Sequence, residues 1–260
     1  MMSSTLLPHE RQALIREQLA RDGRVIAHSL AKSFETSEDT IRRDLREMAS
    51  AGLCRRVYGG ALAPSVEFTP ISARIGEHRD IKEALGRATA SLFEPGMTVL
   101  IDAGSTNLAV ARAIPPGLAL TVVTNAPTIA AALIDRPDIS LVMIGGAVDM
   151  RAGAALGARA IQDLGQTRPD LFLLGGCGLD VAGGVSASGF EEAEFKRAAV
   201  DRARAVVVAI APAKLGISAP FSVLPLSGLS HIVLAGSTDL TLRRAIEAEG
   251  VAVKIAEAPV

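Results

Sequence analysis

Aromatic residues are scarce in this chain of 260 residues: they make up 3% of it, and Trp is absent. Hydrophobic residues nevertheless account for 49% of the sequence. We therefore expect a core built from Ala, Val, Leu and Ile, and this share argues against an intrinsically disordered chain. An excess of one charge is also lacking, because the net charge is −1. Any contact with nucleic acid must therefore come from a local basic patch.

Cysteine and long apolar runs are equally scarce. Cys54 and Cys177 lie far apart in sequence, which does not fit a disulfide framework or a metal site, so we predict a reducing, cytoplasmic setting without a metal. The longest apolar runs, at 141–148 and 205–213, reach about half of the roughly 20 residues that a membrane helix needs. We interpret them as buried strands. Residues 1–8 lack the pattern of a signal peptide.

The first sixty residues predict three helices followed by a hairpin. Apolar residues at helical spacing predict helices over 8–21 and 27–32, with a short extended piece between them. Thr36 or Ser37 can cap the third helix. The third helix has a stripe of apolar residues at i, i+4 and i+7, which we expect to be buried: Ile41, Leu45 and Met48. Gly59-Gly60 is typical of a hairpin turn.

This order of elements is that of a winged helix-turn-helix, which enters a groove of DNA. Arg42, Arg43 and Arg46 lie off the apolar stripe of the third helix, and Arg55 and Arg56 lie on the hairpin. Guanidinium groups suit both phosphates and guanine edges. Taken alone, the paired arginines would fit an ordinary solvated helix equally well. The complete order of elements favours DNA binding.

The stretch TSEDTIRRDLREMASAGLCRRVYGGA, residues 36–61, resembles the signature of the DeoR family of bacterial transcription repressors, and the resemblance continues along nearly the whole chain. It implies a winged helix-turn-helix followed by an α/β effector-sensing domain related to ribose-5-phosphate isomerase. Tyr58 could contact a phosphate or simply cover the hairpin. The expected DNA-binding residues are Ser37, Thr40, Arg42, Arg43, Arg46, Arg55, Arg56 and Tyr58.

Beyond residue 63 the pattern changes. We predict a DNA-binding domain over 1–63, a linker over 64–74 that contains a Pro-bearing polar stretch, and an effector-binding domain over 75–260. In this last part a long helix is expected over 75–93. Short apolar strands then alternate with helices, which indicates an α/β architecture with a mostly parallel sheet.

In such folds ligands bind beyond the carboxyl ends of the strands. The strand that begins near residue 97 ends in a Gly turn with two hydroxyls, followed by a helix, which suits an anion. An ordinary strand-to-helix turn with a Ser or Thr cap is the alternative. The segment resembles the family's phosphate loop, which implies effector-binding roles for Asp102, Gly104, Ser105, Thr106 and Asn107.

Further candidates follow other strands. Thr124 and Asn125 end one strand, where an Asx turn is an equal alternative. Gly178 and Asp180 belong to a segment that resembles a second family motif, and Lys214 can pair with a phosphate or be a solvated loop lysine. Glu194 and Lys196 are two residues apart, so we expect separate contacts or surface charges rather than a catalytic pair.

The chain departs from the family pattern at the sensing end. Ala211 and Gly236 stand where the family has carboxylates, and Asn107 replaces a frequent third threonine. We therefore hypothesise an effector that differs from common sugar phosphates, or weak affinity for them.

The sequence predicts a transcriptional regulator, a repressor of a carbohydrate-metabolism operon that is released by a phosphorylated sugar or related metabolite. Its partners would be double-stranded operator DNA, the effector and further copies of itself, as a dimer or tetramer. No catalytic residue and no cofactor are predicted, because no close acid–base pair, nucleophile–His arrangement or metal cluster is recognisable. The alternatives are a sugar-phosphate isomerase-like enzyme with an accessory DNA-binding head and an effector-independent DNA-binding protein.

Overall fold

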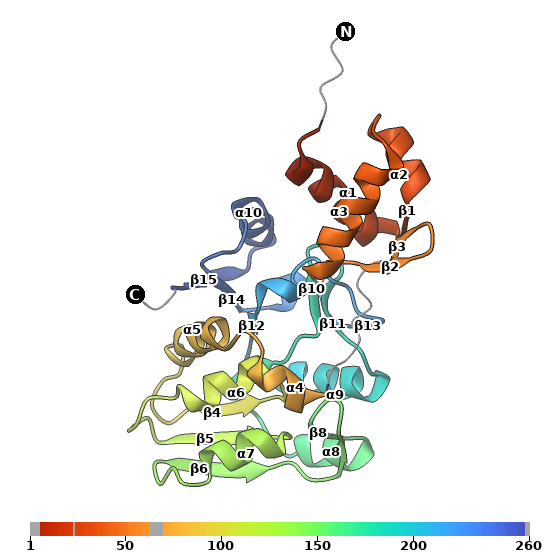
Figure 1. Cartoon of the computed structure of the whole chain (residues 1–260). Helices are drawn as coiled ribbons and strands as arrows, with labels where there is room; N and C mark the ends of the chain where they lie inside the picture. The colour runs from red at the N-terminus through yellow and green to blue at the C-terminus, as the bar shows by residue number, and fades with distance from the viewer. Residues whose placement is uncertain (1–5, 23, 52, 63–69, 258–260) are drawn as a thin grey trace. The chain divides into compact units, whose positions relative to one another are not determined.

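The chain forms two compact units, Met1–Glu67 and Phe68–Val260, each with its own hydrophobic core. The structure is a computed structural model and describes residues 6–22, 24–51, 53–62 and 70–257 (Figure 1). The residues that were predicted to begin the linker, 64–69, lie outside the described part. In the described residues no helix combines the length and the apolar character that crossing a membrane requires.

The first unit is a winged helix-turn-helix, as predicted. Its strands form an antiparallel sheet in the order β1-β3-β2. The elements are α1 (Pro8–Asp22), β1 (Arg24–Ile26), α2 (Ala27–Ser33), α3 (Glu38–Ser50), β2 (Arg55–Val57) and β3 (Gly60–Leu62). At Gly60 a Cβ atom would lie 2.0 Å from the carbonyl oxygen of Val25, so the close approach of β3 to β1 requires glycine there.

Helix α3 forms for the reasons that its sequence indicates. Of the two candidate caps the structure selects Ser37, whose Oγ accepts a hydrogen bond of 3.1 Å from the Thr40 amide. The apolar stripe is buried, with exposed fractions of 0% for Ile41, 2% for Leu45 and 1% for Met48. This stripe joins residues of α1, α2 and the sheet in the core of the unit.

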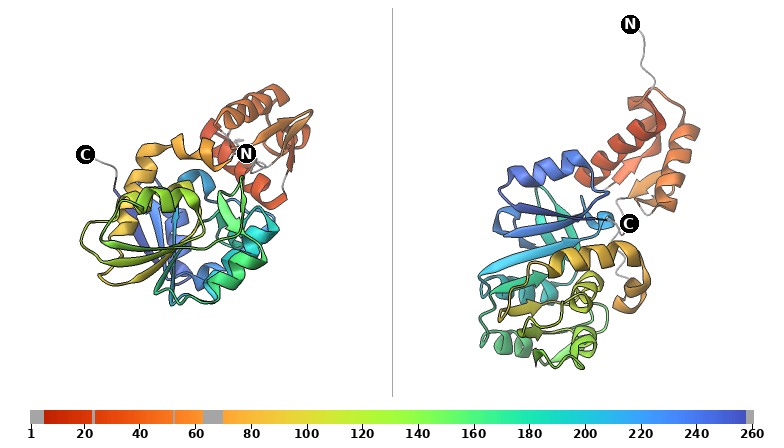
Figure 2. Two further views of the ribbon diagram at one scale, coloured as in Figure 1. Left: turned by 90° about the horizontal axis from the view of Figure 1, so that it is seen from below. Right: turned by 90° about the vertical axis from the view of Figure 1, so that its left-hand side faces the viewer.

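The second unit is built around a parallel sheet of seven strands in the order β15-β14-β12-β9-β4-β5-β6. The strands are β4 (Thr98–Ile101), β5 (Leu120–Thr124), β6 (Ile139–Met143), β9 (Leu171–Leu174), β12 (Ala205–Ile210), β14 (His231–Ala235) and β15 (Ala252–Ala256). Helices α5, α6 and α7 cover one face of the sheet and α9 the other (Figure 2). They span Arg79–Ala90, Ser105–Arg112, Pro127–Leu133 and Phe190–Val200.

Smaller elements complete this unit. An antiparallel sheet has the order β10-β11-β13, and β7 pairs with β8. Their bounds are β7 (Ala147–Asp149), β8 (Ala154–Leu156), β10 (Gly178–Asp180), β11 (Gly184–Ala187) and β13 (Phe221–Leu224). The remaining helices are α4 (Ile71–Gly76), α8 (Ala158–Leu164), α10 (Leu240–Ala248) and two 3-10 turns, η1 (Pro212–Lys214) and η2 (Leu226–Gly228).

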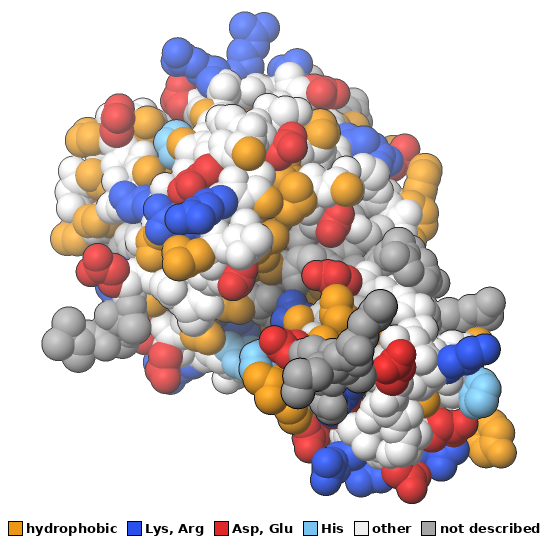
Figure 3. Space-filling view, turned by 90° about the horizontal axis from the view of Figure 1, so that it is seen from above, with side chains coloured by type: hydrophobic (Ala, Val, Ile, Leu, Met, Phe, Trp, Pro, Cys, Tyr) orange, Lys and Arg blue, Asp and Glu red, His pale blue; other side chains and the backbone are white. Residues whose placement is uncertain are grey.

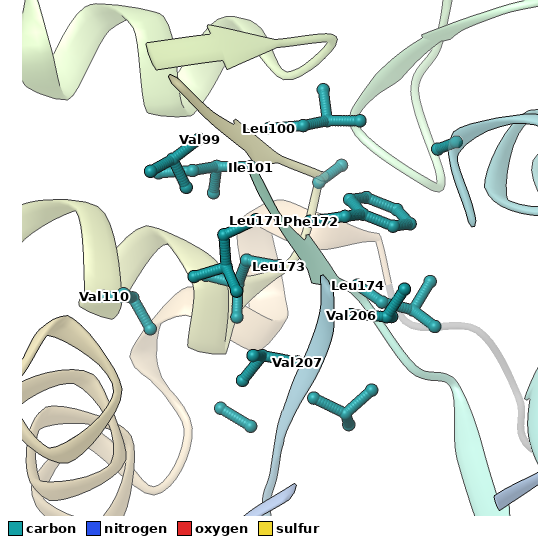
Figure 4. Packing of buried hydrophobic residues seen from close by; sticks show 14 of the residues in the cluster. Val99, Leu100, Ile101, Val110, Leu171, Phe172, Leu173, Leu174, Val206 and Val207 are labelled. Carbon is teal, nitrogen blue, oxygen red and sulfur yellow. The ribbon is translucent and has the colours of Figure 1, made fainter. Parts of the chain in front are cut away.

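The core of the second unit consists of aliphatic side chains from the middle strands, as the composition predicts. Val99, Leu100 and Ile101 of β4 are fully buried and lie beside residues of β9, which in turn lie beside residues of β12 (Figure 4). Phe172 and Phe195 are the largest fully buried apolar side chains among the described residues. The central strands are therefore held on both faces, which fixes the loops at their ends.

Two sequence-based expectations about elements were wrong. The single helix expected over 75–93 is two helices, α4 and α5, because His78 between them has a left-handed backbone with φ of +49°. The apolar run at 141–148 is not a buried strand. It spans β6, at the edge of the sheet, and part of β7. Val142 and Met143 are therefore 43% and 41% exposed.

Candidate functional site

The order in which the chain adds strands to the parallel sheet reverses between β4 and β9. From β4 the strands run outward through β5 to β6, and from β9 they run outward the other way through β12 and β14 to β15. In open α/β sheets a ligand crevice forms at such a reversal, beyond the carboxyl ends of the strands. The loops at this place are residues 102–104 after β4 and 175–177 after β9.

A cleft occupies this position. Its narrow inner part, about 20 Å³, lies between the first turn of α6 and the loop after β9, and its wider outer part is about 250 Å³. Arg74, Ala152, Cys177 and Glu192 line both parts, which therefore adjoin each other. Lys214 lines the inner part.

Most of the residues that were predicted to form an anion cradle line the inner part of the cleft. Gly104 is the residue before α6, and Ser105 and Thr106 form its first turn, whose amide groups a helix leaves without internal partners. The hydroxyls of Ser105 and Thr106 have no hydrogen-bond partner among the described residues. Gly175 also lines this space. A Cβ atom there would lie 2.4 Å from the carbonyl oxygen of Ala103, so the close approach of the two loops requires glycine. Donors thus converge on one small space, as an anion requires.

Asp102 and Asn107 hold the loops around this space in place through buried hydrogen bonds. Asn107 Nδ2 donates to the carbonyl oxygens of Asp102, at 2.9 Å, and Leu173, at 3.2 Å. Asp102 Oδ2 accepts from the Gly175 amide at 3.1 Å and from Lys196 Nζ at 2.6 Å. Asp102 and Asn107 are each 1% exposed. Their hydrogen bonds join the loop after β4 to β9 and the loop that follows it.

Lys196 is the centre of a buried charged network that the sequence analysis missed. Its Nζ lies 2.6 Å from Asp102 Oδ2 and 2.9 Å from Glu192 Oε1. Glu192 also accepts hydrogen bonds from Ser188 Oγ at 3.1 Å and Cys177 Sγ at 3.4 Å. Lys196 is therefore no surface charge, and the expectation that no acid and base lie close together was wrong. The signal was the i, i+4 spacing of Glu192 and Lys196 on α9.

The charges of this network are fixed by one another. Burial favours the neutral form of Lys196, but the carboxylates of Asp102 and Glu192 outweigh burial and raise its pKa. Burial would likewise raise the pKa of Glu192, but the ammonium of Lys196 outweighs it and lowers the pKa to about 2. The carboxylates of Asp102 and Glu192 and the ammonium of Lys196 thus carry one net negative charge together. The cations that line the inner part of the cleft are Lys214 and Arg74.

Lys214 is the titratable cation of the cleft. Its Nζ donates to the carbonyl oxygen of Gly176 at 2.8 Å. Burial lowers the pKa of Lys214 to about 8. Arg74, in the predicted linker, lies on α4 and donates to the carbonyl oxygen of Arg151 at 3.3 Å. No pattern in the sequence indicates that Arg74 lines the cleft.

The other predicted effector contacts lie around the cleft and do not line it. Thr124 Oγ1 donates to the carbonyl oxygen of Ile101 at 2.6 Å, and Asn125 is fully buried with its Nδ2 3.4 Å from the Ala155 carbonyl. Asn125 Oδ1 has no partner in the described residues. Gly178 is a buried residue of β10. Asp180 Oδ1 accepts from the amides of Ala182 and Gly183 at 3.0 and 2.9 Å, which makes it a turn residue.

In the winged helix-turn-helix, some of the predicted DNA-binding residues are bonded to other side chains of the protein. Ser37 and Thr40 are joined by their hydroxyls at 2.8 Å, at the start of α3. Arg42 Nη2 lies 2.9 Å from Glu38 Oε2. The other carboxylate oxygen of Glu38, Oε1, lies 2.8 Å from Nδ1 of His28 on α2. The hydrogen bond from His28 is the main cause of a lowered pKa of Glu38.

The remaining arginines are available to a partner. Arg43, Arg46 and Arg56 are exposed and make no ion pair with any described residue. Tyr58 stands at the tip of the hairpin between β2 and β3 with its side chain fully exposed. The side chain of Arg55 lies outside the described part. On the face of the molecule drawn in Figure 3, Lys and Arg side chains are interspersed with Asp and Glu side chains, so the arrangement of these arginines matters more than total charge.

A winged helix-turn-helix followed by an α/β domain with a cleft beyond the carboxyl ends of its strands is typical of a class of protein, the ligand-responsive DNA-binding regulators. The comparison with protein families agrees: residues 11–67 match the DeoR-like helix-turn-helix domain and residues 77–247 match the DeoR C-terminal sensor domain. The chain belongs to the DeoR family of transcriptional regulators.

Similar curated proteins are regulators as well. The chain is 28% identical to the HTH-type transcriptional regulator GolR of Listeria innocua, over 97% of this chain and all of that protein. It is 33% identical to the glycerol-3-phosphate regulon repressor of Escherichia coli, over 81% of this chain and 84% of that protein. These relatives show that the chain is a transcriptional regulator and not an enzyme.

Solved structures with a similar α/β arrangement include ribose 5-phosphate isomerase A from Neisseria gonorrhoeae. The TM-score is 0.38 at 12% sequence identity, over 53% of each chain. A likeness of this strength carries no conclusion about activity.

Proposed function

We propose that this protein is a cytoplasmic repressor of a carbohydrate-metabolism operon that binds double-stranded operator DNA and is released by a phosphorylated sugar or a related metabolite. The DNA-binding surface would be α3 and the hairpin of β2 and β3. Arg43, Arg46 and Arg56 would supply cations for phosphates or guanine edges. The effector would bind in the cleft at the reversal between β4 and β9.

The observation that carries the choice of effector is the set of free donors in the cradle. Two hydroxyls without a partner in the described part of the chain, the first-turn amides of α6 and the ammonium of Lys214 all line one narrow space. Such a set matches the several acceptor oxygens of a phosphate group better than it matches a neutral sugar. The wider outer part of the cleft, about 250 Å³, would hold the rest of the metabolite.

The release mechanism that we propose is a shift in population. One winged module buries little surface and binds DNA weakly, so a dimer or tetramer would place two modules on two half-sites. An effector that binds one arrangement of subunits better than the other shifts the protein toward that arrangement. The arrangement with the effector would no longer match the spacing of the half-sites.

The test measures release from DNA. A labelled fragment from upstream of the gene is bound to the purified protein, and fluorescence anisotropy follows its release by a series of phosphoesters and by their unphosphorylated parents. We expect release by a phosphoester and not by its parent. Thr106→Val should abolish release and leave DNA affinity unchanged, because the hydroxyl lost lies only in the cradle.

The matched control is Thr128→Val, in the first turn of α7, which does not line the cleft. This variant should respond to the phosphoester like the unaltered protein. Normal release in the Thr106→Val variant would place the anion elsewhere and contradict the proposal.

A further inference from the structure

A second and larger cavity, about 440 Å³, lies along α6 and is bounded by α4 and α5. Residues 105, 108, 109 and 112 of α6 line it together with residue 113, which caps the helix, and they form a single stripe. The three helices are coloured from orange to yellow-green in Figure 1. Apart from Ser105, the residues that line this cavity are absent from the lining of the cleft.

Lys82 is a buried charge in this cavity. The residue is 7% exposed, and its Nζ donates to the backbone carbonyl of Arg74. No carboxylate in the described part of the chain lies within ion-pair distance of it, and burial lowers the pKa of Lys82. Buried lysines are rare unless they are paired, because the charged form loses its hydration. An anion in the cavity would restore a partner.

Two further cations of the cavity also lack an acidic partner. Arg87 on α5 and Arg112 on α6 form no ion pair with any residue that the structure describes. The fourth cation, Arg79, is already paired with Glu83 at 2.8 Å, and Glu83 is the one acidic residue in the lining. Three positive charges therefore remain unbalanced around one space. The rest of the lining is largely apolar, from Ile75 and Leu108 to Ala113.

We propose that this cavity is a second ligand site, which binds a small anionic metabolite whose phosphate or carboxylate group is joined to an apolar body. The anionic group would lie between Lys82, Arg87 and Arg112, and the apolar body would lie against Ile75 and Leu108. The proposal does not depend on the effector assigned to the cleft, because the two spaces share a single lining residue, Ser105.

The test uses the full chain and two probes that share one apolar body, phenyl phosphate and benzoate, with isothermal titration calorimetry. The Thr106→Val variant serves as background so that the cradle does not contribute. We expect one of the probes to bind at one site per chain, and the preferred probe identifies the anionic group. Arg112→Gln and Arg87→Gln should each weaken binding about 10-fold or more, the loss expected for a hydrogen bond to a charged group.

The matched control is Arg244→Gln, which removes an exposed arginine of α10 that does not line the cavity and should leave affinity unchanged. Circular dichroism confirms that each variant is folded. The proposal is overturned if neither probe binds, or if both cavity variants bind as tightly as the control. It is also overturned if Arg112→Gln alters the sedimenting mass without altering probe binding, which would make the cavity a contact between subunits.

Loss of the binding of both probes on introducing Thr106→Val alone would overturn the second site and support the cleft. Binding that persists in Thr106→Val and is lost in Arg112→Gln supports the second site. A failure of phosphoesters to release DNA would bear on the cleft alone, so the two proposals fail separately.

Discussion

At the scale of single residues, two adjacent arginines of α3 have different surroundings in the protein without DNA. Arg42 is held by Glu38, and Arg43 has no partner among the described residues. Glu38 is itself bonded to His28. A phosphate or a base must therefore compete with Glu38 for Arg42, whereas Arg43 is free of such competition among the described residues.

Replacing Glu38 by Gln should tighten binding to DNA. The substitution removes a carboxylate that competes for Arg42 and repels phosphates. We expect a gain in affinity in fluorescence anisotropy at fixed salt, because phosphate contacts depend strongly on salt. Glu17→Gln, an equal charge change at an exposed position of α1, is the control for general charge. An equal gain in both variants would contradict a specific role for Glu38.

Arg43→Ala should act in the opposite direction. We expect a loss of about 1–3 kcal/mol if the side chain reads a base. The loss should be larger for the operator than for unrelated DNA. A uniform loss on both DNAs would assign Arg43 to a phosphate instead.

Lys214 should make effector affinity depend on pH. Burial lowers its pKa to about 8, so its ammonium is charged below that pH and becomes neutral as pH rises through it. A phosphoester binds the charged form, and its affinity should fall by up to about tenfold per pH unit above 8. Calorimetric titrations from pH 7 to 9.5 measure this, and Lys214→Arg, which stays charged, should remove the dependence. A flat profile in the unaltered protein would exclude Lys214 from the phosphate site.

At the scale of elements, the helix-turn-helix is held together by a buried ion pair. Arg11 of α1 contacts both carboxylate oxygens of Asp44 of α3, and the two residues are 4% and 2% exposed. The Asp44 carboxylate outweighs burial and raises the pKa of Arg11. The aspartate in the RRDL part of the signature thus faces the core, while the arginines before it face outward.

Arg11→Met should destabilise the first unit by about 3–5 kcal/mol, because it leaves the Asp44 carboxylate buried without a partner. Urea unfolding followed by circular dichroism measures the change. Arg16→Met, at an exposed position of the same helix, should have little effect. The double variant Arg11→Met with Asp44→Leu should recover much of the stability. A single variant as stable as the parent would show that the pair does not hold α1 to α3.

The elements of the first unit could be predicted closely because their signals are local. The cap at Ser37 and the stripe of Ile41, Leu45 and Met48 depend on spacings within α3. The break between α4 and α5 could not be predicted, since it depends on a left-handed histidine. The exposure of β6 depends on its place at the edge of the sheet. Its apolar sequence alone does not predict that place.

For the same reason, the sequence indicates only part of the candidate site. The cradle from Gly104 to Asn107 is one continuous segment that follows a recognisable strand, so its donors could be found in the sequence. The ion pair of Asp102 with Lys196 joins residues 94 positions apart. No local pattern connects them, and Arg74 reaches the cleft from a third segment.

At the scale of the whole molecule, the protein has two separate cores, and none of the described residues belongs to both. We propose that the effector-binding unit is 68–260 and predict that it responds to ligand alone. In hydrogen exchange, a phosphoester should protect the amides of β4, β9 and α6 and leave those of α3 unchanged in the absence of DNA. Equal protection of α3 would mean that the two units unfold as one.

The place of the cradle in the sheet also has a consequence for the protein while it is being made. Val99 of β4 pairs with Leu171 of β9, and Lys196 and Lys214 follow later still, whereas the described helices and strands of the DNA-binding unit all lie before residue 63. Domains fold in order as the chain leaves the ribosome. A growing chain therefore acquires its helix-turn-helix long before it can sense a metabolite, and a translation product cut short after the first unit would be a regulator that cannot be switched.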